Sequence, residues 1–218
     1  MAKVLPTSAT FLSYNPTGLN ALKCDWLNNL LELVDVTYVS IQEHFLTART
    51  IEKIFMEQFH DYNSYIIPGF RNDGINGGRP KAGLAQLSKA SVSVRKERVL
   101  IDSKRVQAQI LNFPSSRLLW INAYFPTDPG TITFDDRELM EVLNAIEGIL
   151  DTAQFDDVLL AADMNWDLTR QTGFALSVRQ FLNRVNLCSI WESKSINYTH
   201  IHTDDKSFST IDHFIVNE

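Results

Sequence analysis

Five short stretches of the sequence carry polar side chains at the ends of otherwise apolar runs. A carboxylate can hold a divalent cation, and a carboxylate or an imidazole can move a proton during catalysis. Polar groups that several strands deliver to one rim make a site, so we expect these side chains to gather at one rim of the β-structure. They are Asn15 in SYNP, Glu43 in IQEH, Tyr124 in NAYFP, Asp163 and Asn165 in AADMN, and Asp212 and His213 in STIDHF.

Two of these stretches contain the acidic residues that follow buried runs. Glu43 comes after VTYVSIQ, where an unpaired carboxylate would be costly, so it either pairs with a lysine or holds a cation. Asp163 and Asn165 alternate with Met164, which places both side chains on one face of an extended strand. An Asx turn that caps the following segment explains the same pair equally well.

The remaining stretches also have structural alternatives. Asp212 and His213 open an apolar strand and could form a structural pair, because a lone histidine is more often structural than catalytic. Tyr124 precedes Phe125-Pro126 and could be an ordinary core residue. Singly, none of these residues decides the function, and the argument depends on their joint order along the chain.

Strand and helix patterns alternate along the chain and must position these residues. The glycine-rich segment 69–83 predicts a loop, and the four strand-like runs between 83 and 124 predict an antiparallel meander. Apolar residues at three- and four-residue spacing predict helices over 19–34, 47–60, 134–151 and 173–186. Expected strands cover 10–15, 36–43, 62–69, 83–88, 91–99, 104–113, 117–124, 156–165, 189–192, 197–201 and 210–216.

This order of elements predicts an α/β fold with two packed mixed β-sheets flanked by helices, a four-layer α/β/β/α sandwich. The strands are too apolar to face water, so helices should cover the outer faces of both sheets. We expect residues 1–218 to form one domain. The sequence stops just after a strand, which favours a domain taken from a longer polyprotein.

Composition narrows the function classes. The net charge is −6, yet residues 71–106 hold nine basic and three acidic side chains, a local charge of +6. This balance excludes a general nucleic-acid coat protein but allows a localised basic surface facing phosphates, with solvated strand faces as the alternative. No apolar run approaches a membrane span, so no membrane partner is expected. Cys24 and Cys188 are expected to be free buried thiols in a reducing compartment.

The order of the five stretches resembles that of the endonuclease/exonuclease/phosphatase superfamily, from Asn15 to His213. Within it, SYNPTGLN, KCDW, IQEHF, NAYFPTD, DMNWD and STIDHF most resemble the N-terminal endonuclease domain of non-LTR (LINE-type) retrotransposons. The resemblance implies a metal-dependent DNA endonuclease that nicks one strand of target DNA by phosphodiester hydrolysis. The resulting 3′-hydroxyl would prime reverse transcription for integration of the retrotransposon.

The resemblance also implies a metal site. Glu43 would bind the divalent cation, Mg²⁺ with Mn²⁺ as a possible substitute, and Asn15 would lie beside it. Asp212 would touch the metal directly or through water.

By the same resemblance, three residues would hold the scissile phosphate, namely Tyr124, Asn165 and Thr199, the last in NYTH. Asp163 would orient or deprotonate the attacking water. His213 would hydrogen-bond or protonate the phosphate, or act as a base.

The implied partners are double-stranded DNA and the reverse transcriptase and other domains of the same polyprotein. Such a polyprotein is made in the cytoplasm and acts on chromosomal DNA in the nucleus. Candidate DNA contacts come from the glycine-rich loop and from segment 200–208, and we expect binding mostly through phosphates and groove shape. They are Arg71, Arg79, Lys81, His202 and Lys206.

One departure separates this chain from the family pattern. Relatives place an aspartate that supports the catalytic histidine where this sequence has Ser189. A serine can accept from the imidazole N–H but supplies no charge, so the support of His213 should be weaker. A catalytically weakened DNA-binding relative therefore stays open as an alternative. Independently of Ser189, so does an abasic-site repair endonuclease.

Overall fold

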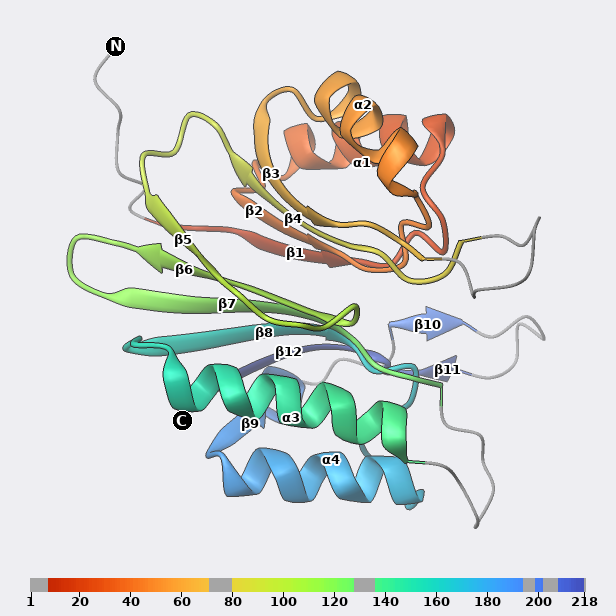
Figure 1. Cartoon of the computed structure of the whole chain (residues 1–218), viewed down its shortest axis with the longest axis vertical. Coiled ribbons are helices and arrows are strands. Elements are labelled where there is room, and N and C mark those ends of the chain that lie inside the picture. The colour runs from red at the N-terminus through yellow and green to blue at the C-terminus, as the bar shows by residue number, and fades with distance from the viewer. Residues whose placement is uncertain (1–7, 71–79, 128–135, 194–198, 202–207, 218) are drawn as a thin grey trace. The chain divides into compact units, whose positions relative to one another are not determined.

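Each of the two β-sheets carries two α-helices on one of its faces (Figure 1). The chain divides into two compact units, Met1–Arg95 and Lys96–Glu218. No helix in the described parts of the chain is long and apolar enough to cross a membrane. The computed structural model describes residues 8–70, 80–127, 136–193, 199–201 and 208–217.

The first unit is built on a four-stranded mixed sheet in the order β1-β2-β4-β3. β1 and β2 are parallel, while β4 pairs antiparallel with both β2 and β3. Its elements are β1 (Phe11–Tyr14), α1 (Ala21–Leu33), β2 (Tyr38–Ile41), α2 (Ala48–Gln58), β3 (Tyr62–Ile67) and β4 (Leu84–Lys89).

Side-chain alternation along the strands builds the core of this unit. Val39 and Ile41 of β2 and Ala85 and Leu87 of β4 face the helices and are fully buried. The helices contribute their periodic apolar residues to the same core, among them Leu27, Leu31, Ile51 and Phe55. Burial of these side chains fixes which face of each strand meets the helices.

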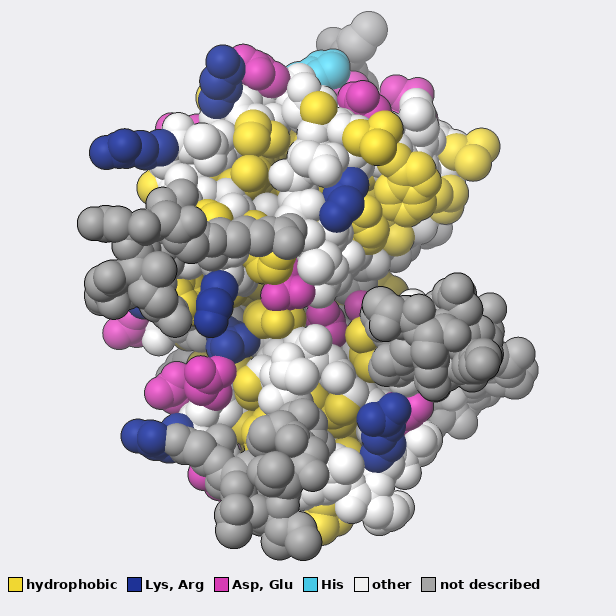
Figure 2. Space-filling view, turned by 90° about the vertical axis from the view of Figure 1, so that its right-hand side faces the viewer, with side chains coloured by type: hydrophobic (Ala, Val, Ile, Leu, Met, Phe, Trp, Pro, Cys, Tyr) yellow, Lys and Arg dark blue, Asp and Glu magenta, His cyan; other side chains and the backbone are white. Residues whose placement is uncertain are grey.

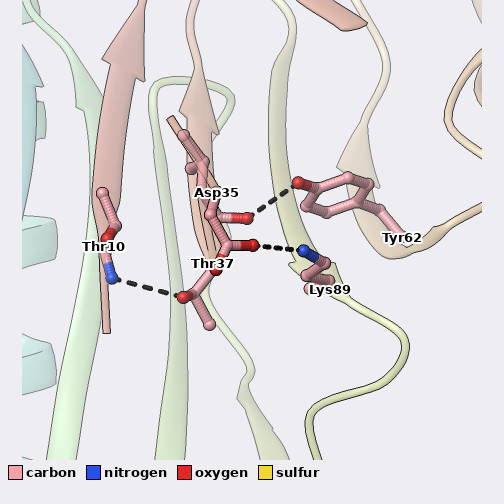
Figure 3. Close-up of polar contacts among 6 residues, drawn as sticks. Thr10, Asp35, Thr37, Tyr62 and Lys89 are labelled. Atoms are coloured by element: carbon pink, nitrogen blue, oxygen red, sulfur yellow. Dashed lines mark hydrogen bonds and ion pairs between the residues drawn. The ribbon is translucent and has the colours of Figure 1, made fainter. Parts of the chain in front are cut away.

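Polar contacts join the strands at one end of this sheet (Figure 3). The N–H of Thr10 donates to Thr37 Oγ1 over 3.3 Å, and the N–H of Lys89 donates to Thr37 O over 2.9 Å. The Tyr62 hydroxyl donates to Val36 O over 2.8 Å, and burial, with nearby carboxylates, raises its pKa to about 12. These bonds tie all four strands together at the end of the sheet where β1 and β2 begin.

The second unit is built on a six-stranded mixed sheet in the order β5-β6-β7-β8-β12-β9, beside a short pair β10-β11. β7 and β8 are parallel, and β12 runs antiparallel to both β8 and β9. Its elements are β5 (Arg95–Val99), β6 (Val106–Asn112), β7 (Arg117–Tyr124), α3 (Arg137–Thr152), β8 (Asp157–Asp163), α4 (Gly173–Arg184), β9 (Leu187–Ser189), a 3₁₀-helix (Ile190–Ser193), β10 (His200–Ile201), β11 (Phe208–Ser209) and β12 (Asp212–Asn217).

Alternate residues of the central strands face α3 and α4 and form one buried core. Leu160 of β8 sits at its centre, opposite Ile121 of β7 and Ile215 of β12, and all three are 0% exposed. α3 and α4 add a stripe each, at three- and four-residue spacing. The stripes are Leu139, Val142, Leu143, Ile146 and Ile149, and Phe174, Ala175, Val178, Phe181 and Leu182.

The structure confirms the predicted α/β class, with two mixed sheets and four α-helices in the described residues. The predicted four-strand meander is wrong in its first member, because β4 pairs with β2 and β3 and not with β5. The alternation of apolar and polar residues indicates which face of a strand is buried, but it does not indicate which strands it pairs with. The expectation of one domain from a longer polyprotein stays a prediction.

The strand expected over 189–192 is also wrong, because β9 ends at Ser189 and residues 190–193 form a 3₁₀-helix. Trp191 explains the early end. Its indole N–H donates to Asp212 O over 2.7 Å, and its backbone N–H reaches Ser189 Oγ at 3.4 Å. These bonds turn the chain away from the extended path.

Truncation of the core should be costly. We expect Leu160→Ala to lower the free energy of unfolding by about 2–5 kcal/mol, because the methyl groups removed leave a cavity in a packed core. Urea denaturation measures the change. Leu100→Ala is the control, since Leu100 is 92% exposed, and its effect should stay within about 0.5 kcal/mol. Equal effects of the two variants would contradict this description of the core.

Candidate active site

Asn15 and Glu43 lie together at one edge of the first unit's sheet. They follow β1 and β2, which are parallel, so both strands deliver them to the same edge. The Asn15 amide Nδ2 donates to Glu43 Oε2 over 2.9 Å, and Asn15 Oδ1 accepts from the Thr17 N–H at 2.7 Å. Asn15 therefore orients the carboxylate, and Glu43 supplies the charged oxygens.

The backbone around Glu43 is unusually strained. Glu43 has φ 50°, and Thr17 and Phe45 are also left-handed with φ 48° and 56°. A left-handed residue with a side chain costs roughly 1–2 kcal/mol, and such strain persists only where surrounding contacts hold it. The Gly18 N–H donates to Glu43 O over 2.7 Å, which is one of these contacts.

The first turn of α1 holds the loop that follows Asn15. Asn20 caps the helix, with Oδ1 accepting from the Lys23 N–H at 3.0 Å. The Lys23 ammonium then donates back to Pro16 O and, over 3.1 Å, to Gly18 O. The loop between β1 and α1 is thus fixed by the helix that follows it.

His44, which sequence reasoning did not single out, lies fully buried beside Glu43. The Leu46 N–H donates to His44 Nδ1 over 3.0 Å, so Nε2 carries the hydrogen and donates to Ile67 O over 3.1 Å. Burial lowers the pKa of His44 to about 4, so the ring is neutral at pH 7. The signal in the sequence was a histidine directly after a strand-ending glutamate.

In the second unit, three of the predicted residues stand in one row across neighbouring strands. Asp163 of β8 is paired with Tyr124 of β7 on one side and with Asp212 of β12 on the other. Paired residues point to the same face of a sheet, here the face opposite the α3–α4 core. Asp163 is only 1% exposed, and its backbone O accepts from the Phe125 N–H.

Asn165 lies just beyond this row. β8 ends at Asp163, so the expectation that both residues share a face of one extended strand is wrong. Asn165 is left-handed (φ 59°), and its N–H donates to Asp163 Oδ1 over 2.9 Å, which is the Asx turn that the sequence left open. The Asn165 Nδ2 donates to Phe125 O over 2.7 Å, so the amide stays beside the row.

His213 follows Asp212 but belongs to the opposite face, paired with Ala162, and is 4% exposed. Its Nε2 lies 3.1 Å from Thr210 O, so it carries the hydrogen, and Nδ1 accepts from Ser189 Oγ over 3.2 Å. Ser189 therefore occupies the supporting position inferred from the sequence, but as a donor and not as an acceptor. Burial lowers the pKa of His213 to about 4.

Thr199 holds the start of β12. Its Oγ1 accepts from the N–H groups of Ile211 and Asp212, over 3.0 and 3.1 Å. A hydroxyl that accepts twice still has its own hydrogen to donate. Thr199 can therefore offer one hydrogen bond next to Asp212.

Most of the candidate DNA contacts, Arg71, Arg79, His202 and Lys206, lie outside the described residues. Lys81 is exposed, and its backbone pairs with Phe70 over 2.8 and 3.0 Å. On the face that Figure 2 shows, most described Lys and Arg side chains lie apart from one another among acidic and apolar ones. The predicted basic surface therefore stays a prediction.

The donor set at Glu43 fits a magnesium ion. Mg²⁺ takes oxygen ligands, keeps several waters and needs only one or two carboxylates. Glu43 provides one oriented carboxylate, with Asn15 beside it. Within the described ranges no group of three or more His, Cys, Asp or Glu side chains is arranged to hold a metal ion.

A cavity of about 360 Å³ in the first unit is separate from these residues. Phe59, Tyr62 and Lys89 line it. The Lys89 N–H donates to Thr37 O just before β2, whereas Glu43 follows β2. The cavity therefore lies at the other end of the strand and is no part of the candidate site.

Comparison with known proteins identifies the fold. No protein-family model and no curated protein matches the sequence. Among solved structures, the AP endonuclease LMAP from Leishmania major aligns over 96% of this chain and 79% of its own, with a TM-score of 0.73 and 16% identity.

Two further structures share the fold. An endonuclease/exonuclease/phosphatase family protein from Leptotrichia buccalis covers 97% of this chain and 88% of its own, with a TM-score of 0.68 and 14% identity. The endonuclease domain of TRAS1, a telomere-specific non-LTR retrotransposon, covers 97% and 86%, with a TM-score of 0.61 and 11% identity. These neighbours confirm the resemblance inferred from the sequence at the level of the fold.

Any side chain at Gly83 should destabilise the fold, because Gly83 lies against the His44 ring. It is left-handed (φ 96°), and a Cβ there would lie 2.4 Å from His44 Cε1 and 2.7 Å from both ring nitrogens. We expect Gly83→Ala to lower the free energy of unfolding by about 1–3 kcal/mol, measured by urea denaturation. Gly148→Ala is the matched control, because Gly148 lies in α3 with nothing within 4 Å, and it should stabilise by about 0.5–1 kcal/mol.

Stability should fall on mild acidification. His44 and His213 have folded-state pKa values of about 4 against an ordinary value of 6.5, so the unfolded chain binds more protons below pH 6.5. The stability they contribute is complete above pH 6.5 and is lost as the pH falls toward 4. Between pH 7 and pH 5 each of the two histidines should lower the free energy of unfolding by about 2 kcal/mol.

Urea denaturation at both pH values measures this loss. A stability that stays constant from pH 7 to pH 5 would contradict the buried, neutral state of both histidines.

Proposed function

We propose that this chain is a metal-dependent DNA endonuclease that cuts one strand by phosphodiester hydrolysis. The observation that carries the proposal is the row of Tyr124, Asp163 and Asp212 at the end of three neighbouring strands, with Asn165 and Thr199 beside it. The fold that holds this row is also that of an AP endonuclease and of a retrotransposon endonuclease.

In this proposal Glu43 holds Mg²⁺, which Mn²⁺ could replace, and Asn15 keeps the carboxylate turned for it. When bound, the ion supplies Lewis-acid stabilisation of the charge that develops on the phosphate. The left-handed backbone at Glu43 and the bond from Asn15 fix the carboxylate before any substrate arrives. Such preorganisation avoids rearrangement during the reaction. Asp212 is a further candidate ligand, directly or through water.

In this proposal Asp163 orients or deprotonates the attacking water. The Asn165 N–H donates to Asp163 Oδ1 over 2.9 Å and holds the carboxylate within the row. Asn165 has a second amide hydrogen beside the one given to Phe125 O, and with Tyr124 and Thr199 it offers neutral donors to a phosphate. Neutral donors hold the phosphate without competing for the cation.

His213 acts in this proposal as a neutral hydrogen-bond donor. Its ring belongs to the sheet face opposite the row and its Nε2–H is bonded to Thr210 O. Contact with a phosphate therefore requires the ring to turn at the start of β12 and its hydrogen to exchange that carbonyl for a phosphate oxygen. An exchange of one hydrogen bond for another, here to a charged acceptor, is favourable or nearly neutral. Ser189 steadies the ring through Nδ1 but adds no charge.

We further propose that the nick leaves a 3′-hydroxyl that primes reverse transcription for retrotransposon integration. The motifs NAYFPTD and STIDHF and the shared fold of the TRAS1 endonuclease support this role. The reverse transcriptase and other domains of a polyprotein would be its partners, and the nucleus its site of action. An abasic-site repair endonuclease is the second candidate, favoured by the fold shared with LMAP.

Nicking of supercoiled plasmid tests the function. We expect nicks with Mg²⁺ or Mn²⁺ and none with chelator, and a faster reaction on an abasic oligonucleotide than on plasmid would favour the repair enzyme. Glu43→Gln and Asp163→Asn should each lower the rate roughly 10²–10⁴-fold, because each removes a group acting on the reacting atoms. Exposed carboxylates provide the controls Glu52→Gln and Asp151→Asn, which should stay within about twofold.

A double variant shows whether both groups serve one reaction. If they do, the combined loss in Glu43→Gln/Asp163→Asn should be clearly smaller than the product of the single losses. Folded single variants with wild-type nicking would refute the assignment of both residues.

A further inference from the structure

Asp167 uses its two carboxylate oxygens for two different segments of the chain. Oδ1 accepts locally, from the N–H of Thr169 over 2.8 Å and from its hydroxyl over 2.7 Å. Oδ2 accepts from the N–H of Thr210 over 3.3 Å, 43 residues further along the sequence. One side chain of the loop after β8 thus reaches the turn that precedes β12.

The segment that Asp167 reaches is the one that holds His213. Thr210 O accepts the hydrogen of His213 Nε2 over 3.1 Å, and Thr199 Oγ1 accepts from the two N–H groups that follow Thr210. Asp167 and Thr199 therefore bind the backbone of residues 210–212 from two other segments, and His213 binds it from the adjoining residue. Of these three, Asp167 is the one that carries a negative charge.

The ionisation state of Asp167 is consistent with this arrangement. Burial raises the pKa of Asp167, but the hydrogen bonds from Thr169 and Thr210, with His213 nearby, outweigh it and leave the pKa below the ordinary value. Asp167 is therefore ionised at neutral pH. A backbone N–H that donates to a carboxylate makes a stronger bond than one that donates to a neutral acceptor.

We propose that Asp167 is a positioning residue, which fixes the Thr210 backbone so that the His213 ring is held for the reaction. Ser189 contributes no charge on the Nδ1 side, and the carboxylate of Asp167 provides the charged anchor from the Thr210 side. The catalytic consequence rests on the endonuclease function proposed above. The structural part, Asp167 holding His213 through Thr210, stands without it.

The variant Asp167→Asn distinguishes the hydrogen bonds that Asp167 makes to Thr169 from the one that it makes to the Thr210 N–H. Asparagine has one oxygen acceptor and one NH₂ donor. With its oxygen kept by the two donors of Thr169, the NH₂ faces the Thr210 N–H, donor against donor. Thr169→Val is the matched control. It removes the Thr169 hydroxyl that donates to Asp167, but it leaves the carboxylate and its hydrogen bond from the Thr210 N–H intact. Asp156→Asn is a second control, since Asp156 Oδ2 also accepts a backbone N–H, from Arg117, before β8 begins.

Two measurements decide the outcome. The first is the hydrogen exchange rate of the His213 Nε2–H in ¹⁵N-histidine-labelled protein, assigned through the Cβ protons of that ring. Asp167→Asn should speed this exchange at least tenfold, because Thr210 O is no longer fixed. The second is the split of kcat and KM in DNA nicking, where kcat should fall about tenfold while KM stays within about twofold. Both controls should stay within about twofold in each measurement.

The two measurements test the positioning role of Asp167 and its catalytic consequence separately. An unchanged ring exchange rate in folded Asp167→Asn overturns the positioning role, and faster exchange with unchanged kcat overturns its catalytic consequence. Asp167→Glu keeps both oxygens and should fall between wild type and Asp167→Asn, which tests the role again where the amide variant does not fold. If wild-type protein cuts no DNA with either cation, the proposed function fails, while the exchange rate still decides whether Asp167 holds His213.

Discussion

The register of β8 against β7 and β12 is the constraint on which the second unit depends. A slip of one residue would turn Leu160 away from the α3–α4 core and Asp163 into it, at the cost of a buried core side chain and an unpaired buried carboxylate. The apolar core therefore sets the position of the polar row. Tyr124, Asp163 and Asp212 stand together because their neighbours along each strand are held in the core.

Beyond the strand ends, position is set by short polar loops and not by the sheets. Glu43 and Asn165 both adopt left-handed backbone at the second residue beyond the end of a strand, and this changes the direction of the chain there. Asparagine tolerates this conformation, whereas glutamate does so at a cost. The hydrogen bonds from Asn15 and Gly18 hold Glu43 in place. This cost at Glu43 is consistent with a functional position, because strain that contributed nothing would be removed easily by a glycine or asparagine.

Each unit also contains a buried histidine that directly follows a candidate metal ligand. His44 follows Glu43, and His213 follows Asp212. Both rings are neutral, and each makes one bond close in sequence and one to a distant segment. His44 bonds to Leu46 N and Ile67 O, and His213 bonds to Thr210 O and Ser189 Oγ. A neutral imidazole donates at one nitrogen and accepts at the other, so it joins two segments without burying a charge. The histidines therefore help to hold the loops that carry the acidic residues.

The sequence by itself determined the fold class, most helices and strands, and the order of the polar residues that end the strands. These features follow from local periodicity, which records whether a side chain is buried. Only the tertiary structure decided that β4 joins β2 and β3, that Asn165 lies in a turn beyond β8, and that Asp167 reaches Thr210 across 43 residues. The physical reason is that periodicity reports burial on one face. It carries no information about which distant segment supplies the partner for a strand edge, a carboxylate or an imidazole.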